Sequence, residues 1–196
     1  MIAIIDYGAG NLTSVRKAFE HLGADVCVTS HPLDVARAAK LVLPGVGHFS
    51  ATAALRRDGM QEAILNALRS GTPFLGICVG MQWLFEGSAE APQVGGARLL
   101  RGVCAPFPQH VKSPHVGWNS IEIRPGSRLL RGVRSGAFVY YAHSFFGPVT
   151  GDVAAETEYG ITFAAAVERD EIFGVQFHPE KSGATGLAIL NNFCEL

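Results

Sequence analysis

The chain has 196 residues, of which 48% are hydrophobic and 17% are charged; this length and composition predict one domain over residues 1–196 with its own apolar core, and they exclude a disordered chain. Its 16 Lys and Arg residues and 17 Asp and Glu residues leave a net charge of −1, which gives no reason to expect nucleic acid or a membrane surface as a partner. Four cysteines without a close pair, no recognisable signal peptide and no apolar stretch long enough for a bilayer predict a protein of the reducing cytoplasm.

Strands and helices alternate in the first half of the sequence. A buried strand at 2–6 precedes a helix at 12–22, whose apolar residues share one face and whose ends are marked by Asn11 and Gly23. The other elements predicted here are strands at 25–29, 41–43 and 74–77, and helices at 33–39, at 60–70 and from about residue 80 onward. Continuous apolar strands that alternate with helices indicate a parallel sheet covered on both faces.

The second half has a different pattern, with strands joined by tight turns. These strands are predicted at 120–124, 137–141, 152–159, 161–169 and 171–177, and a last helix at 184–193. We therefore expect an α/β fold with a central, mostly parallel sheet that gains antiparallel strands in the second half of the chain.

Cys78 lies in the apolar stretch PFLGICVGMQWLF, with Gly76 and Gly80 on either side. The pattern G-x-C-x-G between a strand and a helix is that of a nucleophile elbow, in which a sharp turn presents a reactive side chain at a helix N-terminus. The flanking glycines would make room for the strained turn. A buried structural cysteine is the usual alternative in such a segment, and this stretch alone leaves both interpretations open.

A base for such a thiol is present near the C-terminus, in the stretch FGVQFHPEKSG. Residues two apart on a strand point to the same side, so His178 and Glu180 can face one space if the chain stays extended, which Pro179 favours. The carboxylate would then orient the imidazole. A surface ion pair is an alternative, and so is a Cys/His/Glu metal site, although the sequence has no zinc-binding spacing to support it.

Two glycine-rich turns follow predicted strands. The stretch DYGAGNLT after the first strand begins like a dinucleotide fingerprint but has no third glycine, and no acidic residue ends the second strand, so a nucleotide site is poorly supported. The stretch PGVG at 44–47 can present backbone N–H groups to an oxyanion formed over Cys78, or it can be an ordinary turn.

Taken together, the motifs around Cys78, PGVG and FHPE resemble those of the class I, triad-type glutamine amidotransferases, and the resemblance covers the whole chain. Within that class, the stretches at 6–15, 43–49, 75–88, 112–119, 140–145 and 174–183 are similar to the glutaminase subunits of imidazole glycerol phosphate synthase in histidine biosynthesis. KSPHVGWN at 112–119 is the most specific of them. Val79, Ala9 and Ser113 depart mildly from the family pattern. The resemblance implies a three-layer, flavodoxin-like fold.

The resemblance also implies the roles of residues. Cys78 would attack the side-chain amide of glutamine, His178 would transfer protons, and Glu180 would orient His178. The oxyanion would meet backbone N–H groups of Val79 and of the turn that contains Val46 and Gly47. Family positions that hold the amino-acid end of glutamine correspond to Gly47, Gln82, His143, Ser144 and Phe145. We expect no cofactor and no metal.

Glutaminases of this kind pass ammonia to a second protein. The family pattern implies a heterodimer with a (β/α)8-barrel cyclase, because a dry passage keeps ammonia unprotonated and nucleophilic. We expect the docking face to include Asn11, Trp118, Asn119, Tyr140 and Lys181, although a tryptophan such as Trp118 is as commonly buried in a core.

Three other interpretations are compatible with parts of the sequence. One is another class I glutaminase, of pyridoxal phosphate or aminobenzoate synthesis, against which the stretch at 112–119 argues. A second is a non-catalytic thiol sensor or chaperone of similar fold, for which the pair of His178 and Glu180 would have no use. A third is a metal-binding module.

Overall fold

The computed structural model describes residues 1–196, apart from the side chain of Asp58. Its main sheet has nine strands in the order β2-β1-β3-β4-β12-β11-β10-β7-β8. The parallel strands are β1 (Ile2–Ile5), β2 (Val26–Thr29), β3 (Lys40–Gly45), β4 (Phe74–Cys78) and β12 (Ile172–Val175). The antiparallel strands are β7 (His115–Ile123), β8 (Ala137–His143), β10 (Val153–Glu158) and β11 (Thr162–Arg169). The α/β fold with antiparallel strands in the second half is thus confirmed.

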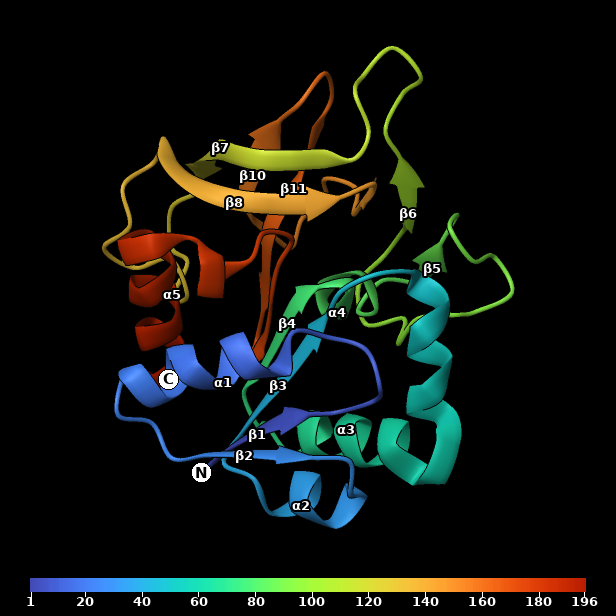
Figure 1. Ribbon diagram of the computed structural model, residues 1–196, viewed down its shortest axis with the longest axis vertical. Coiled ribbons are helices and arrows are strands. Elements are labelled where there is room, and N and C mark those ends of the chain that lie inside the picture. Colours follow the sequence, from blue (N-terminus) through green and yellow to red (C-terminus); the bar gives the residue numbers. More distant parts are fainter.

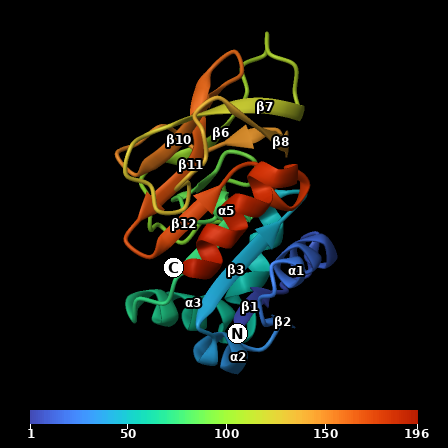
Figure 2. The ribbon, with the colours of Figure 1, turned by 90° about the vertical axis from the view of Figure 1, so that its left-hand side faces the viewer.

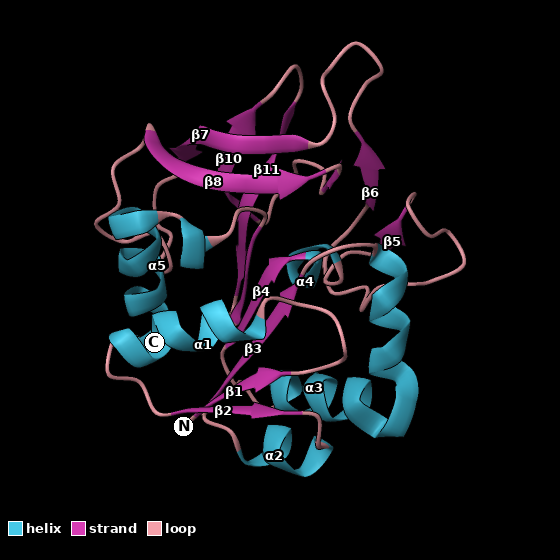
Figure 3. Cartoon of the chain, viewed as in Figure 1, coloured by secondary structure: helices cyan, strands magenta, loops and turns pink.

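Helices cover both faces of the parallel strands, as Figures 1 and 3 show. The first four strands send alternate side chains to opposite faces, so Ile4 packs in one apolar core and Ile5 in another. The first core also contains residues of α1 (Leu12–His21) and α5 (Gly183–Glu195), and the second contains residues of α2 (Pro32–Arg37) and α3 (Met60–Arg69). The molecule therefore has three layers around this part of the sheet.

The local sequence explains where α1 begins and ends. Val15 and Phe19 are buried one turn apart on its inner face. The Asn11 side chain accepts a hydrogen bond from the backbone N–H of Ser14 at 3.4 Å, as an N-cap does. Gly23 has a φ of 77° just beyond the last turn, a conformation that glycine adopts at little cost.

The antiparallel strands form the other end of the molecule (Figure 2). Strands β7 and β8 make a hairpin whose register places His115 opposite His143 and Trp118 opposite Tyr140. Because neighbouring residues of a strand point to opposite faces, this hairpin buries one row of side chains, which includes His115 and His143, and turns the other row, which includes Val116 and Trp118, outward.

Several elements were not predicted from the sequence. They are the 3-10 helix η1 (Phe49–Gly59), a small sheet of β5 (Gly87–Ser88), β6 (Val103–Pro106) and β9 (Phe145–Phe146), and the first five residues of β7. Two-residue strands have no period to detect, and β7 begins with outward-facing apolar residues around Gly117, which weaken the alternation. No helix in the described part of the chain combines the length and the apolarity needed to span a membrane.

Candidate active site

Cys78 ends β4, and the helix α4 (Val79–Gln82) begins at the next residue. Its backbone has a φ of 54° and a ψ of −109°, a region that residues with a side chain rarely adopt. A Cβ atom on Gly76 would lie 2.5 Å from the backbone oxygen of Gly80, and one on Gly80 would lie 1.8 Å from the backbone oxygen of Leu43. Both glycines are therefore sterically required by the sharp turn that presents the thiol.

His178 and Glu180 lie together, and both side chains are almost completely buried. Nδ1 of His178 is 2.9 Å from Oε1 of Glu180. The chain does not stay extended between them, as the sequence interpretation required, because Pro179–Lys181 form the 3-10 turn η2. This tight turn, rather than strand alternation, brings the carboxylate back to the ring. The pair that the sequence suggested is present, but its conformational explanation is wrong.

The charge state of His178 follows from its partners. Burial acts to lower its pKa, but the hydrogen bonds and charges of Cys78 and Glu180 outweigh burial and raise the pKa to about 10. Since Nδ1 faces Glu180, the other ring nitrogen is the one available to the sulfur. At neutral pH the arrangement therefore favours an imidazolium, which Glu180 orients and whose other nitrogen is directed at Cys78.

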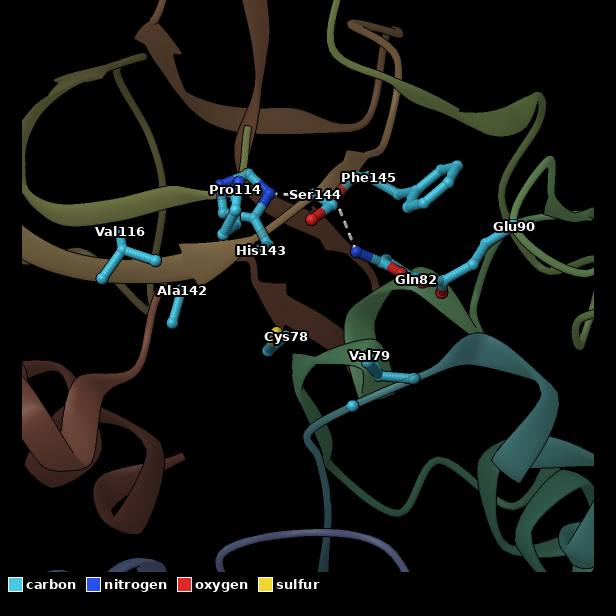
Figure 4. A pocket seen from close by; sticks show the side chains of 11 residues that line it. Cys78, Val79, Gln82, Glu90, Pro114, Val116, Ala142, His143, Ser144 and Phe145 are labelled. Atoms are coloured by element: carbon cyan, nitrogen blue, oxygen red, sulfur yellow. Dashed lines mark hydrogen bonds between the residues drawn. The ribbon is translucent and has the colours of Figure 1, made fainter. Parts of the chain in front are cut away.

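A cavity of about 320 Å³ opens over the sulfur (Figure 4). It is lined by Gly47, Cys78, Val79, Gln82, Glu90, Pro114, Val116, Ala142, His143, Ser144 and Phe145. The five residues expected to hold a bound amino acid thus all reach one cavity together with the thiol. Val46, expected near the oxyanion, does not line it and is partly exposed.

The amide of Gln82 has a fixed orientation in this cavity. Its Nε2 donates to the backbone oxygen of Phe145 at 2.8 Å and to Oε1 of Gln176 at 3.2 Å. The first of these bonds is drawn in Figure 4. Both N–H groups are used inside the protein, so Oε1 of Gln82 is the atom left to accept a hydrogen bond from a bound molecule.

His143 and His115 form a buried, neutral pair behind the cavity. Burial lowers the pKa of His143 to about 3 and that of His115 to about 4. Nδ1 of His143 donates to the backbone oxygen of Phe145 at 2.9 Å, since that oxygen can only accept. Nε2 of His143 therefore accepts from Nδ1 of His115 at 3.1 Å, and Asn119 donates to the far nitrogen of His115 at 3.4 Å. The backbone thus sets both tautomers.

Two polar residues of this site were not predicted from the sequence. Glu90 lines the cavity, and its Oε2 accepts from the backbone N–H of Phe49 at 2.7 Å. It lies in a loop after β5, where no period or motif marks it. Gln176 is completely buried and its Nε2 lies 3.6 Å from Sγ of Cys78. Its spacing of two residues from His178 is a signal that could have identified it.

The residues expected on a docking face divide into two groups. Trp118 is 54% exposed, and its ring meets the Tyr140 ring edge-on. Nζ of Lys181 lies 5.8 Å from the centre of the Tyr140 ring. The side chains of the other two residues make hydrogen bonds within the protein. Asn11 caps α1, and Asn119 donates to the backbone oxygen of Glu158 and to His115.

An apolar patch extends beyond Trp118 and Tyr140 on the outer side of the β7–β8 hairpin. Val116 is 58% exposed and Phe138 is 59% exposed, and strand alternation places both on the face of Trp118 and Tyr140. We call Val116, Trp118, Phe138 and Tyr140 the hairpin face. Val116 also lines the cavity, so the hairpin face and the site are continuous.

The described residues include no group of three or more His, Cys, Asp or Glu side chains arranged to hold a metal ion. The cysteines at 27, 78, 104 and 194 all carry free thiols.

Comparisons with known proteins identify relatives over the whole chain. Residues 3–196 match the family described as glutamine amidotransferase class-I. The chain is 46% identical to the imidazole glycerol phosphate synthase subunit HisH of Caldanaerobacter subterraneus and 47% identical to that of Methanothermobacter thermautotrophicus; each alignment covers 100% of this chain and 98% of the relative. Among solved structures, a glutamine amidotransferase superposes with a TM-score of 0.79 at 15% identity, covering 100% of this chain and 98% of that one. PurLQS from Thermotoga maritima superposes with a TM-score of 0.76 at 18% identity, covering 99% of this chain and 97% of that one.

Proposed function

Because the chain belongs to the class I glutamine amidotransferase family, we propose that Cys78, His178 and Glu180 form a catalytic triad that hydrolyses glutamine. The chain is the glutaminase subunit of an imidazole glycerol phosphate synthase, in histidine biosynthesis. The observation that carries the assignment of the triad is the convergence of a strained thiol and a buried imidazole–carboxylate pair, with the thiol lining the cavity.

In the proposed reaction the Cys78 thiolate attacks the amide carbon of glutamine. The imidazolium of His178 gives its proton to the departing ammonia, and a glutamyl thioester remains on the sulfur. His178, now neutral, takes a proton from water, and the resulting hydroxide attacks the thioester and releases glutamate. The raised pKa of His178 supports this sequence, because it keeps the acid protonated until the leaving group forms.

The oxyanion of each tetrahedral intermediate needs N–H donors. The backbone N–H of Val79 is proposed as one, since it is the first residue of α4 and lines the cavity beside the thiol. The second would come from the turn at Val46 and Gly47; the alignment of Gly45 with Cys78 and the position of Gly47 on the cavity wall support this.

The polar groups of the cavity suit the amino-acid end of glutamine. A positively charged α-ammonium group needs acceptors, and the carboxylate of Glu90 and Oε1 of Gln82 are both available on the cavity wall. Ser144 and the turn at Gly47 would meet the α-carboxylate. The neutral state of His143 is compatible with a position that shapes the pocket without adding charge.

We propose that a (β/α)8-barrel cyclase docks on the hairpin face. Four exposed or half-exposed apolar and aromatic side chains in one patch are typical of a protein interface. Because Val116 belongs to both the patch and the cavity, a partner seated there would cover the site and receive ammonia without its release to water. Free thiols at all four cysteines support a cytoplasmic location for the pair.

The test uses the purified chain with its cyclase. Cys78→Ala should abolish synthesis that depends on glutamine and leave synthesis from added ammonium salt at the level of the wild-type pair, because only the nucleophile is lost. Glutamine-dependent synthesis that survives in this variant would contradict the proposed triad.

A further inference from the structure

Gln176 is a second side chain directed at the sulfur, and the triad does not account for it. It follows β12, is completely buried, and its Nε2 lies 3.6 Å from Sγ of Cys78. The chain bends at residues 176 and 177, between the end of β12 and His178, and the side chains of Gln176 and His178 both reach the sulfur. An amide and an imidazole therefore approach the thiol from one stretch of chain.

The direction of the Gln176 amide is fixed by the backbone. The oxygen of Phe145 can only accept, so the group of Gln82 that faces it at 2.8 Å must be the NH2 group. That same NH2 group donates to Gln176 at 3.2 Å, so Gln176 must present its oxygen there. Only its NH2 group is then left to face Cys78. The usual ambiguity between amide oxygen and nitrogen is resolved by this one-way chain of donors.

An N–H donor that is aimed at sulfur favours the thiolate over the thiol. A hydrogen bond to a charged group is roughly twice as strong as one between neutral groups, and here the contact is closed off from water. A thiol is only a weak acceptor, so the donor loses most of its benefit when the sulfur is protonated or acylated. The same donor assists the sulfur twice, when it forms as a thiolate and when it leaves the thioester as one.

We propose that Gln176 is a catalytic residue that stabilises the thiolate of Cys78, and that Gln82 also serves as a positioning residue for it. This inference rests on the proposed function, in which Cys78 is the nucleophile. The proton of the thiol still goes to His178, and no bond to Gln176 is made or broken. The alternative is that Gln176 only fills the core and satisfies Gln82, in which case its loss would change stability but not thiol reactivity.

The experiment measures the reactivity of Cys78 without glutamine or a partner. The full chain is alkylated with iodoacetamide at pH 7, and the rates at Cys78 and Cys27 are followed by mass spectrometry; the half-exposed Cys27 on β2 serves as the internal standard. Gln176→Leu and Gln176→Met both remove the donor and keep a similar volume. In each, alkylation of Cys78 should slow about tenfold, as expected for the loss of one charge-assisted hydrogen bond, while Cys27 keeps its rate.

Alkylation of Cys78 at the wild-type rate in either folded variant would overturn the role of Gln176. If both variants unfold, the wild-type chain provides the test, because the side-chain NH2 resonances of Gln176 in a 15N-glutamine-labelled sample should shift when Cys78 is alkylated. No shift there would also overturn the proposal. Neither result would affect the glutaminase assignment, which fails only if the wild-type chain with its cyclase does not use glutamine.

Discussion

The backbone strain at Cys78 leads to a prediction with an unusual sign. With a φ of 54° and a ψ of −109°, a residue that has a Cβ atom costs about 1–3 kcal/mol there, whereas glycine adopts such a conformation freely. Glycine loses about 0.5–1 kcal/mol more backbone entropy on folding than alanine does. Subtracting the second cost from the first leaves Cys78→Gly more stable than Cys78→Ala by about 1 kcal/mol, within a range of about 0–2.5 kcal/mol.

The two variants form a matched pair, because each removes the sulfur and they differ by one methyl group. Their free energies of unfolding are to be compared by urea denaturation, with the m-value checked for equality. For a chain of this length a gap of about 1 kcal/mol corresponds to a melting temperature about 2–4 °C higher for the glycine variant. Neither variant should hydrolyse glutamine, so the stabilising change is also an inactivating one.

A control variant tests the usual effect of glycine in place of alanine, which is a loss of stability. Ala188 is exposed on α5, where replacement of alanine by glycine should cost about 1 kcal/mol. The reasoning about strain is refuted if Cys78→Ala is as stable as Cys78→Gly or more stable, while Ala188→Gly behaves as expected.

Three further predictions concern the elbow, the buried histidines and the hairpin face. Gly80→Ala places a Cβ atom 1.8 Å from a backbone oxygen and should lower the free energy of unfolding by about 3 kcal/mol or more. In the control Gly151→Ala the Cβ atom would meet nothing within 4 Å, and the free energy of unfolding should stay within about 1 kcal/mol of wild type. Equal losses for the two variants in urea denaturation would contradict the steric argument. The pKa of His143 is about 3 in the folded state and about 6.5 in the unfolded state, so the unfolded state binds more protons between these pH values. The contribution of His143 to the free energy of unfolding should therefore fall by about 2 kcal/mol from pH 7 to pH 5. His143→Phe should make the free energy of unfolding less dependent on pH in this range, and parallel curves for the two proteins would contradict the low pKa. Phe138→Ser should weaken cyclase binding about tenfold, as measured by calorimetry. Leu33 is 69% exposed on α2, and Leu33→Ser should leave the affinity unchanged. Equal effects of the two substitutions would mean that the cyclase binds elsewhere.

The motif around Cys78 could be predicted from sequence because its cause is local. A strand-to-helix turn leaves little space near its own backbone, so Gly76 and Gly80 mark it in the sequence. The atom that most restricts Gly80 is nevertheless the backbone oxygen of Leu43 on a neighbouring strand, and no local pattern contains that contact.

The pairing of His178 with Glu180 was predicted from strand alternation, which is not how the two side chains meet in the structure. A spacing of two residues predicts a shared side only on an extended chain, and the chain turns at Pro179 instead. The same spacing of two residues relates Gln176 to His178, and both side chains reach the sulfur although the chain bends at residues 176 and 177. Periodicity located the right segment, but it could not say where the strand conformation ends.

Glu90 could not be predicted because nothing near it in the sequence relates it to the site. Its loop reaches the cavity through a hydrogen bond with Phe49, across 41 positions of the chain. The hairpin face is a similar case, since Val116 and Phe138 become one patch only after β7 and β8 pair. Such sites are defined by tertiary contacts, which a single sequence does not contain.

The register of two parallel strands joins the elbow to the turn that faces it. Gly45 on β3 is aligned with Cys78 on β4, and Leu43 is aligned with Gly76. A slip of one residue between these strands would turn the apolar side chains of β4 to the wrong faces, and it would move the PGVG turn away from the sulfur. The burial of β3 and β4 therefore supplies the free energy that holds Cys78 in its strained conformation, and it sets the distance between the nucleophile and the proposed oxyanion donors at the same time.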